Sequence, residues 1–407
     1  MSQLPKTINL ASADFARNLF TWSEALREER PVCKARISAL SIYLVTRYDD
    51  CQAILKDPRI VRNRTTATGG SRVPFPTPKA LQPMMQSMIQ EDDPNHRRLR
   101  ELVRRAFSPR AIEQLEARID AYTTRLLDSF EGRRSFDLQK EYAEPIPMRM
   151  ISDMMGLDQS AAPELKKIIS TLTEGFTGVK VLKSIFLELP KVVAFTRNLV
   201  QEKRDQPGDD ILTALIQAEE DGDRLTEDEL VSMVILLIIG GFETTVHLIT
   251  NGVVALTDHP DQLARLQRDS SLGGSLVEEV LRHRGPIQST KPGYTTEEIE
   301  LHGVTIPKGK PVMPLFAAAN HDPRAFDHPQ AFDIGRSPNR HLGFGHGIHF
   351  CLGAHLARAE ARIGLTRLFE RYPELKPARP SDQLTLQTMP GWHRYQGLEV
   401  TPTGRKT

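Results

Sequence analysis

The stretch from His341 to Arg362 reads HLGFGHGIHFCLGAHLARAEAR and sets a single cysteine, Cys351, in a glycine-rich loop that runs into a helical pattern. A thiolate at a helix N-terminus is stabilised by the helix dipole and by unpaired backbone N–H groups. Glycines ahead of it let the backbone approach a flat group closely. Two other interpretations stay open on these residues alone. A lone cysteine is usually a buried structural residue. The other interpretation is a zinc site with His346 and His349, but the spacing does not support it and no second cysteine lies in this stretch.

The composition of the chain is that of a folded globular protein. The 407 residues are 39% hydrophobic and 26% charged, with a formal net charge of +1, which argues against disorder and against nucleic-acid binding. Three cysteines in a reducing compartment do not form a disulfide framework. The N-terminus lacks the apolar segment of a signal peptide. The longest apolar run, Val231–Phe242, is shorter than the roughly 18 residues of a membrane span. We therefore expect a cytoplasmic protein without a membrane anchor.

The hydrophobic periodicity predicts a mainly α protein with a smaller β region. The apolar, β-branched segment Ser38–Asp50 is typical of a strand, with PVCKARI before it as a hairpin partner. Helical periodicity dominates from about Asn95 to Leu256. Within it, the residues Thr226 to Glu229 form a capping box, which predicts a helix that runs to about Asp258.

The last third of the chain changes character. Alternating residues between Gly285 and Pro314, with turns at His302-Gly303 and Lys308-Gly309, predict β-hairpins. A long irregular stretch follows, and then a last helix from Leu352 to about residue 370. A structureless stretch of roughly 30 residues is unusual unless it wraps something.

A second unusual stretch is MVILLIIGGFETTVH, Met233–His247, in which Gly240 and Gly241 interrupt an apolar helix. Each glycine inside a helix costs roughly 1 kcal/mol relative to alanine, so two in a row indicate that something lies close to the backbone. Glu243 beside Thr244 in apolar surroundings needs a partner to be buried. Tight helix packing with a satisfied carboxylate is the simpler interpretation of the same residues.

Two charged pairs have a spacing that places both side chains on one helix face. Glu279 and Arg282 are three residues apart and can form a charge-assisted pair. His96 and Arg100 are four residues apart and can bind an anionic group. Either pair, taken alone, is more typical of a solvated helix face.

Together and in this order, these stretches resemble the cytochrome P450 superfamily. The pattern Phe344-x-x-Gly347-x-x-x-Cys351-x-Gly353 matches its haem-binding signature at every fixed position, and GIHFCLGAHLARAEAR is similar to its bacterial soluble branch. The similarity spans about Leu44 to the C-terminus. It implies a single domain, residues 1–407, with the triangular, mostly α cytochrome P450 fold. Haem b would lie between the oxygen-activating helix and the helix that follows the cysteine.

The resemblance implies three groups of cofactor contacts. Cys351 would be the axial ligand of the haem iron, where a thiolate favours cleavage of the O–O bond. The loop residues that pack near the sulfur or let the loop pass close to the ring would be Phe344, Gly345, Gly347 and Gly353. The haem propionates would be held by His96, Arg100 and His349. The loop would be braced from behind by Glu279 and Arg282.

The resemblance also implies a monooxygenase that uses O2. Gly240 would leave room for dioxygen, and Glu243 with Thr244 would deliver the protons that its reduction consumes. The substrate pocket would include Leu236, Ile239, Gly240, Ile287, Ser289, Thr290, Met389 and Pro390. Specificity would lie in four segments, at residues 73–87, 171–189, 287–290 and 389–392. Their apolar content predicts a lipophilic small-molecule substrate. The alternative is that they are simply mobile surface loops.

Electrons would come from a separate protein, and the chain would act as a monomer. Without a membrane anchor, the expected donor is of the ferredoxin or flavodoxin type and docks on the Cys351 side. A fused reductase is not expected, because no sequence follows Thr407. Candidate docking residues are Arg97, Arg98, Arg104, Arg105 and Arg358. Two competing functions are a haem-thiolate enzyme that uses peroxide or catalyses a rearrangement, and a haem protein without turnover. The acid–alcohol pair argues against both.

Several positions depart from the family pattern. Gly293 stands where an arginine often reaches a haem propionate, and Lys291 is a candidate substitute. Ala331 stands where an arginine often completes the Glu–Arg network, so Arg336 or His341 is expected to take that part. The remaining departures are Phe242 in place of a histidine and His321 in place of an arginine. The histidines His346 and His355 are expected at the surface, near the docking site of the donor.

Overall fold

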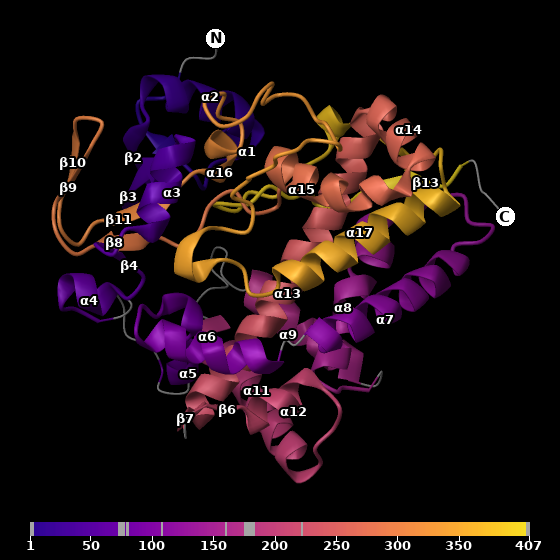
Figure 1. Ribbon diagram of the computed structural model, residues 1–407, viewed down its shortest axis with the longest axis horizontal. Helices are drawn as coiled ribbons and strands as arrows, with labels where there is room; N and C mark the ends of the chain where they lie inside the picture. The colour runs from indigo at the N-terminus through magenta and orange to yellow at the C-terminus, as the bar shows by residue number, and fades with distance from the viewer. Residues whose placement is uncertain are drawn as a thin grey trace.

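The structure, a computed structural model, describes residues 4–71, 78, 81–106, 109–158, 161–174, 184–220 and 223–403. Its outline is roughly triangular (Figure 1), with helices filling most of it and the larger sheet gathered at one corner. The predicted class, mainly α with a smaller β region, is confirmed.

The helices and strands have the following bounds. The helices are α1 (Ala13–Arg17), α2 (Leu19–Glu29), α3 (Tyr48–Lys56), α4 (Arg64–Thr68), α5 (Gln82–Met85), α6 (Asn95–Ala106), α7 (Pro109–Asp128), α8 (Pro145–Met154), α9 (Ala162–Glu174), α11 (Leu189–Asp205), α12 (Ile211–Gln217), α13 (Glu227–Asp258), α14 (Pro260–Arg268), α15 (Gly273–Arg284), α16 (Phe316–Ala319) and α17 (Ala354–Arg371). The strands are β1 (Ile8–Asn9), β2 (Val32–Ile37), β3 (Leu40–Val45), β4 (Ile60–Val61), β5 (Phe136–Asp137), β6 (Glu219–Glu220), β7 (Asp223–Arg224), β8 (Gly293–Thr295), β9 (Ile299–Leu301), β10 (Val304–Ile306), β11 (Pro311–Pro314), β12 (Lys376–Pro377) and β13 (Glu399–Thr401).

The larger sheet has the strand order β1-β2-β3-β11-β8-β4. The predicted hairpin before Asp50 is confirmed as β2 and β3, which pair antiparallel from Val32 to Val45. Strand β11 pairs parallel with β3 and antiparallel with β8. Strand β4 pairs antiparallel with β8, with Val61 opposite Tyr294. The sheet therefore brings the chain after β4 next to the start of β8, which carries Gly293.

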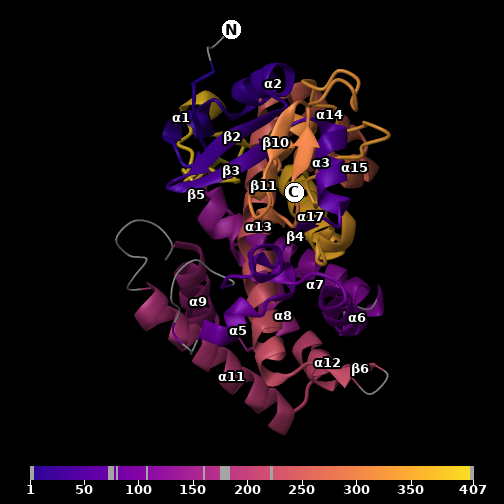
Figure 2. The ribbon, with the colours of Figure 1, turned by 90° about the vertical axis from the view of Figure 1, so that its left-hand side faces the viewer.

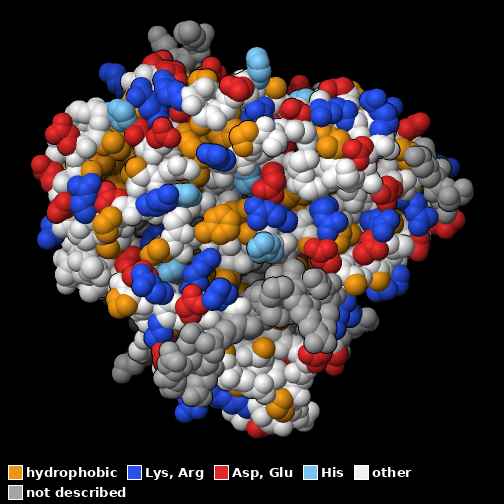
Figure 3. Space-filling view, in the orientation of Figure 1, with side chains coloured by type: hydrophobic (Ala, Val, Ile, Leu, Met, Phe, Trp, Pro, Cys, Tyr) orange, Lys and Arg blue, Asp and Glu red, His pale blue; other side chains and the backbone are white. Residues whose placement is uncertain are grey.

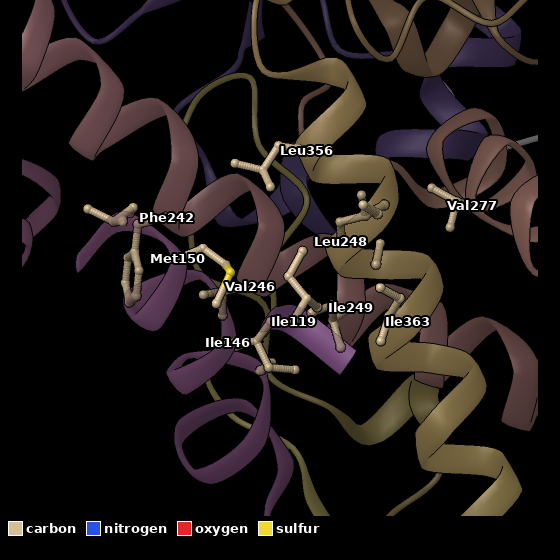
Figure 4. Close-up of a cluster of buried hydrophobic side chains, with 14 of the residues drawn as sticks. Ile119, Ile146, Met150, Phe242, Val246, Leu248, Ile249, Val277, Leu356 and Ile363 are labelled. Carbon is tan, nitrogen blue, oxygen red and sulfur yellow. The ribbon is translucent and has the colours of Figure 1, made fainter. Parts of the chain in front are cut away.

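Helix α13 runs through the centre of the molecule, as Figure 2 shows from the side. Its predicted start is confirmed, because Thr226 and Glu229 form both hydrogen bonds of the capping box. Most of its residues are buried against α8, α15 and α17. Figure 4 shows part of this core, with Met150, Val246 and Ile363 among the packed side chains. The helix thus serves as the scaffold to which the elements around it are fixed.

The apolar stretch of α13 is longer than the run seen in the sequence. Within the described ranges it is the one helix long and apolar enough to cross a membrane. More than half of its apolar window is buried inside the fold. The core helix of a globular protein meets the same criteria, so this feature does not call for a bilayer.

The irregular stretch after α16 is also confirmed, since only a short 3-10 turn, Gly347–His349, interrupts it before α17. It wraps around the buried side of α15. The Glu279 and Arg282 side chains on that helix have no solvent exposure (0% each). Arg282 donates to the backbone carbonyls of the irregular stretch at Asn320, Pro329 and Ala331, and Glu279 accepts from the Asp333 N–H.

Candidate active site

The loop before α17 is held in shape by its own backbone. Gly345 and Gly347 have φ angles of 75° and 72°, a region that favours glycine. The Cys351 N–H donates to the Phe344 carbonyl at 2.9 Å, which closes the loop. A Cβ on Gly347 would lie 2.6 Å from the Leu55 carbonyl oxygen, so the loop also packs closely on α3. The cysteine is therefore presented from a fixed turn rather than from a free loop.

Opposing effects act on the pKa of the Cys351 thiol. Burial raises the pKa of the Cys351 thiol, while the Gly353 N–H, Arg100 and Arg358 act in the opposite direction. Burial and the groups at the N-terminus of α17 thus act on the sulfur in opposite directions. A coordinated metal ion deprotonates a thiol outright. The site favours a thiolate that is stabilised by a metal rather than by the helix alone.

The ring of Phe344 is clamped from outside the loop. The Arg358 guanidinium lies 4.5 Å from the centre of this ring and binds both oxygens of Glu278, at 2.7 and 2.9 Å. His341 Nε2 lies 3.1 Å from the same carboxylate. These contacts outweigh burial and lower the pKa of Glu278 to about 2. His341 thus braces the loop through Glu278, and much of the positive charge of Arg358 is compensated.

Helix α13 is mostly buried but has one accessible face. Gly240 is exposed, and a Cβ added to it would meet nothing within 4 Å. On the next turn, Thr244 Oγ1 donates to the Gly240 carbonyl at 2.6 Å. Glu243 and Thr244 are both partly exposed, whereas Phe242, in the position of the expected histidine, is buried. The expected group around Gly240 therefore lies together on an accessible turn.

Glu243 has a partner that sequence reasoning missed. Arg394 Nη1 donates to Glu243 Oε2 at 2.8 Å, and both side chains are mostly buried. The Arg394 guanidinium also lies 5.4 Å from the ring centre of Trp392. Since 151 residues separate the two charges, no local pattern in the sequence signals this ion pair.

A second buried acid, Glu360, ties α13 to α17. Its pKa is raised by burial to about 8, and a hydrogen bond from Thr245 partly offsets that rise. Glu360 is therefore mainly protonated at neutral pH. Thr245 follows Thr244 directly. This contact therefore fixes the position of the open turn of α13 relative to α17, the helix after the cysteine loop.

The predicted propionate-binding residues converge from two elements. The rings of His96, on α6, and His349, in the cysteine loop, have centres 4.3 Å apart. Both Nε2 atoms are buried without a hydrogen-bond partner. Burial lowers the pKa of Arg100, while the Cys351 sulfur favours its charged form. Buried donors without acceptors are costly, so this arrangement fits an anionic group such as a haem propionate.

The predicted Glu–Arg brace is present and more extensive than expected. Arg282 binds Glu279 through two hydrogen bonds of 2.7 and 2.8 Å. Arg336 Nε lies 3.2 and 3.3 Å from the two oxygens of Glu279. Asn339 Nδ2 donates to Glu279 Oε2 at 3.0 Å. Arg336, rather than His341, therefore takes the part that Ala331 leaves open.

The zinc interpretation of the cysteine loop gains no support. Among the residues that the structure describes, no group of three or more His, Cys, Asp or Glu side chains could hold a metal ion. The open glycine turn, the unpartnered imidazoles and the single fixed thiol instead fit haem, which needs one axial ligand, a flat approach and donors for its carboxylates.

Comparison with known proteins agrees with this fit. A family model described as cytochrome P450 matches residues 8–272 and 274–392. The chain belongs to the cytochrome P450 family.

Several relatives of this P450 resemble it over nearly their full length. Cytochrome P450 107B1 of Saccharopolyspora erythraea is 40% identical, covering 91% of each chain. The vitamin D(3) 25-hydroxylase of Pseudonocardia autotrophica is 39% identical, covering 92% of each chain. The solved structure of myxobacterial cytochrome P450 CYP267B1, 35% identical, has a TM-score of 0.90 and covers 97% of this chain and 99% of the other. This P450 binds haem b and is a haem-thiolate monooxygenase.

Two of the four predicted specificity segments of this P450 lie side by side. Ile287 and Trp392 form an antiparallel bridge, and Gln288 N–H donates to the Gly391 carbonyl at 2.8 Å. Met389 and Pro390, in the same turn, are partly exposed, as are Leu236 and Ile239 on α13. Parts of the other two predicted segments, residues 73–77, 79–80 and 175–183, lie outside the described residues.

Two predicted pocket residues are engaged elsewhere. Ser289 is buried, and its hydroxyl donates to the Pro314 carbonyl at 2.6 Å. The Thr290 hydroxyl accepts from Arg62 at 3.3 Å. Thr290 therefore lies with Arg62 near His349, and no local pattern in the sequence pointed to Arg62.

The basic residues expected to meet an electron donor are mostly paired within the protein. Arg97 binds Asp93 at 3.0 Å, and Arg98 binds Glu229 and Asp223. Arg104 binds Glu101 at 2.9 Å, and the side chain of Arg105 lies outside the described residues. On the face that carries α17, hydrophobic side chains surface among Lys, Arg and His (Figure 3).

The remaining histidines divide between surface and interior. His355 is exposed, as expected. His346 was expected at the surface, but it is partly buried and its Nε2 atom has neither solvent contact nor a hydrogen-bond partner. The ring is therefore at the surface only in part, because the loop packs on α3. His321 is buried, with Nδ1 3.0 Å from the Ala317 carbonyl, and burial lowers its pKa to about 3.

Proposed function

We propose that this P450 hydroxylates or epoxidises a lipophilic small molecule with electrons from a ferredoxin-type donor. When bound, the haem activates O2, so that two electrons and two protons yield one oxygen atom inserted into the substrate and one molecule of water. The carrying observation is the open turn of α13, where Gly240, Glu243 and Thr244 lie on an accessible face of a buried helix.

The chain's own residues supply and direct the protons. The Thr244 hydroxyl rests on the Gly240 carbonyl, 2.6 Å away, and is therefore held at the open face. It can give up its proton there and accept another from the solvent side. Glu243, one residue before it, is the carboxylate that passes protons inward. Arg394 is a positioning residue, because its ion pair fixes where the Glu243 carboxylate stands.

The test of this assignment is Thr244→Ala. We expect the variant to bind haem and consume donor electrons, while most of the oxygen consumed leaves as hydrogen peroxide instead of entering product. The matched control is Thr257→Ala, because Thr257 makes the same kind of bond, to the Val253 carbonyl at 3.0 Å, further along the same helix. If Thr244→Ala kept the product yield per electron of the wild type, the proton-delivery assignment would fail.

The lipophilic substrate class rests on the pocket residues and on the relatives. Leu236 and Ile239 precede Gly240 on the partly exposed side of α13. One relative is by name a vitamin D(3) hydroxylase, and the CYP267B1 structure holds myristic acid. We expect steroid-like or long-chain apolar compounds to shift the haem from low to high spin. A shift produced only by small, strongly polar compounds would contradict the proposal.

The donor is proposed to dock over the cysteine loop. Ile348 and Phe350, just before Cys351, have exposed fractions of 45% and 39%, which is unusual for large hydrophobic residues. Arg97 and Arg104 are exposed basic residues on α6, each in a surface ion pair, with Asp93 and Glu101. Charge complementarity with an acidic donor raises the encounter rate. Reduction by a ferredoxin should therefore slow as salt rises, and a salt-independent rate would argue against this docking mode.

We also propose that the chain works as a single-domain, cytoplasmic monomer. One cluster of buried hydrophobic residues extends from Met88 to Val400 and supports a shared core. Size-exclusion chromatography with light scattering should give a mass near 45.8 kDa plus haem. A stable mass of twice that value would contradict the monomer.

A further inference from the structure

Arg62 is a cation whose guanidinium meets only neutral acceptors in the described part of the chain. It donates to the Thr290 hydroxyl and to the Lys291 carbonyl. Asp92 lies nearby, but its two oxygens are taken by the backbone N–H groups of Arg62 and Asn63, at 2.7 and 2.9 Å. Burial lowers the pKa of Arg62 to about 10. A partly desolvated guanidinium without a carboxylate is unfavourable unless an anion joins it.

The surroundings of Arg62 point to where that anion lies. The ring of His349, in the cysteine loop, has its centre 4.3 Å from that of His96 on α6. The Nε2 atoms of His96 and His349 are buried and unpartnered. A cleft of about 360 Å³ is lined by Arg62, Thr290, Gly293 and His349, among others. Arg62, just after β4, and His349, in the cysteine loop, thus line the same cleft. Asp92 and Asp93 line it too, but both oxygens of Asp92 already accept from backbone N–H groups.

Gly293 explains why the guanidinium comes from Arg62, directly after β4, and not from β8. A Cβ built on Gly293 would clash with Ile60 Cγ2, so no side chain can rise from β8 at this point while Ile60 is present. Strand β4 pairs with β8 at Val61 and Tyr294, and the Arg62 N–H, on the next residue, donates to the Asp92 carboxylate, which fixes the backbone there. The guanidinium of Arg62 is therefore delivered to the vicinity of Gly293 by the neighbouring strand.

We propose that Arg62 binds a haem propionate and takes the place of the arginine that Gly293 excludes. Charge-assisted hydrogen bonds to a carboxylate are the strong ones, and a guanidinium can make two of them in parallel. Lys291, considered above as the substitute, contributes its backbone carbonyl to hold Arg62. The proposal rests on the haem site described above and assigns it a further cofactor-binding residue.

The test compares haem retention in Arg62→Ala, Lys291→Ala and the control Arg59→Ala. Arg59 lies three residues earlier, is exposed and pairs with Asp57 and Glu297. Transfer of haem from each holoprotein to excess apomyoglobin is followed by absorbance. We expect Arg62→Ala to lose haem about tenfold faster than wild type, the effect of losing one hydrogen bond to a charged group. Both other variants should match wild type.

A second readout separates a direct contact from a general loosening of the fold. Removing a cation beside a propionate favours the oxidised haem, so the reduction potential of Arg62→Ala should become more negative, while that of Arg59→Ala stays unchanged. Arg62→Gln keeps neutral donors toward Thr290 and should show the same shift with less effect on folding. If both Arg62 variants kept the haem-loss rate and potential of wild type, or if Lys291→Ala showed the change instead, the proposal would be overturned. The carbon monoxide spectrum of wild type reports separately on whether the haem site itself is correct.

Discussion

Arg282→Met removes the centre of the brace behind the cysteine loop. Arg282 makes two hydrogen bonds to Glu279 and three to the carbonyls of Asn320, Pro329 and Ala331. Methionine fills a similar volume but supplies no donor. The variant therefore removes the Arg282 donors from the carbonyls of Asn320 and Pro329 and from part of a buried carboxylate, whereas the Ala331 carbonyl keeps Arg336.

The expected loss of unfolding free energy depends on the partners that Glu279 keeps in the variant. Breaking a buried ion pair by removing one partner costs about 3–5 kcal/mol. Glu279 keeps Arg336, Asn339 and the Asp333 N–H as partners, so we expect a value at the lower end, about 3 kcal/mol. In Arg336→Met the carboxylate would still be paired with Arg282, so the loss should be smaller. The double variant should lose more than the sum of the two, because it leaves Glu279 without any cation.

The assay is guanidinium denaturation of the holoproteins, followed by far-UV circular dichroism and extrapolated to water. Arg265→Met is the matched control, because Arg265 binds Asp333 of the same wrapped stretch at 2.7 Å with both side chains about 40% exposed. An exposed pair of this kind contributes about 1 kcal/mol or less. If Arg282→Met cost no more than Arg265→Met, the brace would not be the stabilising element described here.

Three further perturbations test other parts of the structure. Because burial raises the pKa of Glu360 from 4.5 to about 8, the folded state keeps a proton that the unfolded chain releases, and its contribution to stability falls as pH rises through this window. Glu360→Gln should flatten the fall in unfolding free energy between pH 5 and 8, and an unchanged slope would contradict the burial argument. Arg394→Gln should leave haem content intact but lower coupled turnover about tenfold, with an altered pH profile of kcat. Unchanged turnover and pH profile would show that the Glu243 carboxylate needs no positioning by Arg394. Thr226→Ala removes half of the capping box and should cost about 1 kcal/mol in denaturation. A loss near zero would mean that tertiary packing alone sets the start of α13.

Local patterns predicted the elements and the central part of the site. The capping box at Thr226 and the alternating residues before Asp50 depend on neighbours only a few residues away, and the structure has both. The glycine-rich loop around Cys351 likewise carries its geometry in its own sequence, through Gly345 and Gly347.

The missed residues act over long separations in the chain. Arg62 meets Thr290 across 228 positions, and Arg394 meets Glu243 across 151. Neither arginine lies in a pattern that differs from an ordinary surface charge, so only the fold assigns them partners. The surroundings of Cys351 are only partly visible in the sequence for a related reason. The helix N-terminus is visible in the sequence, whereas the burial that opposes it depends on how the loop packs.

The central claim is that Cys351 provides the thiolate ligand of the haem. Its most direct test is the absorbance spectrum of the reduced, carbon monoxide-bound protein, recorded for wild type and for Cys351→Ser. We predict the red-shifted Soret band of a thiolate-ligated haem in wild type and its complete loss in the variant. Absence of this band in correctly folded wild type, or its survival in Cys351→Ser, would contradict the account.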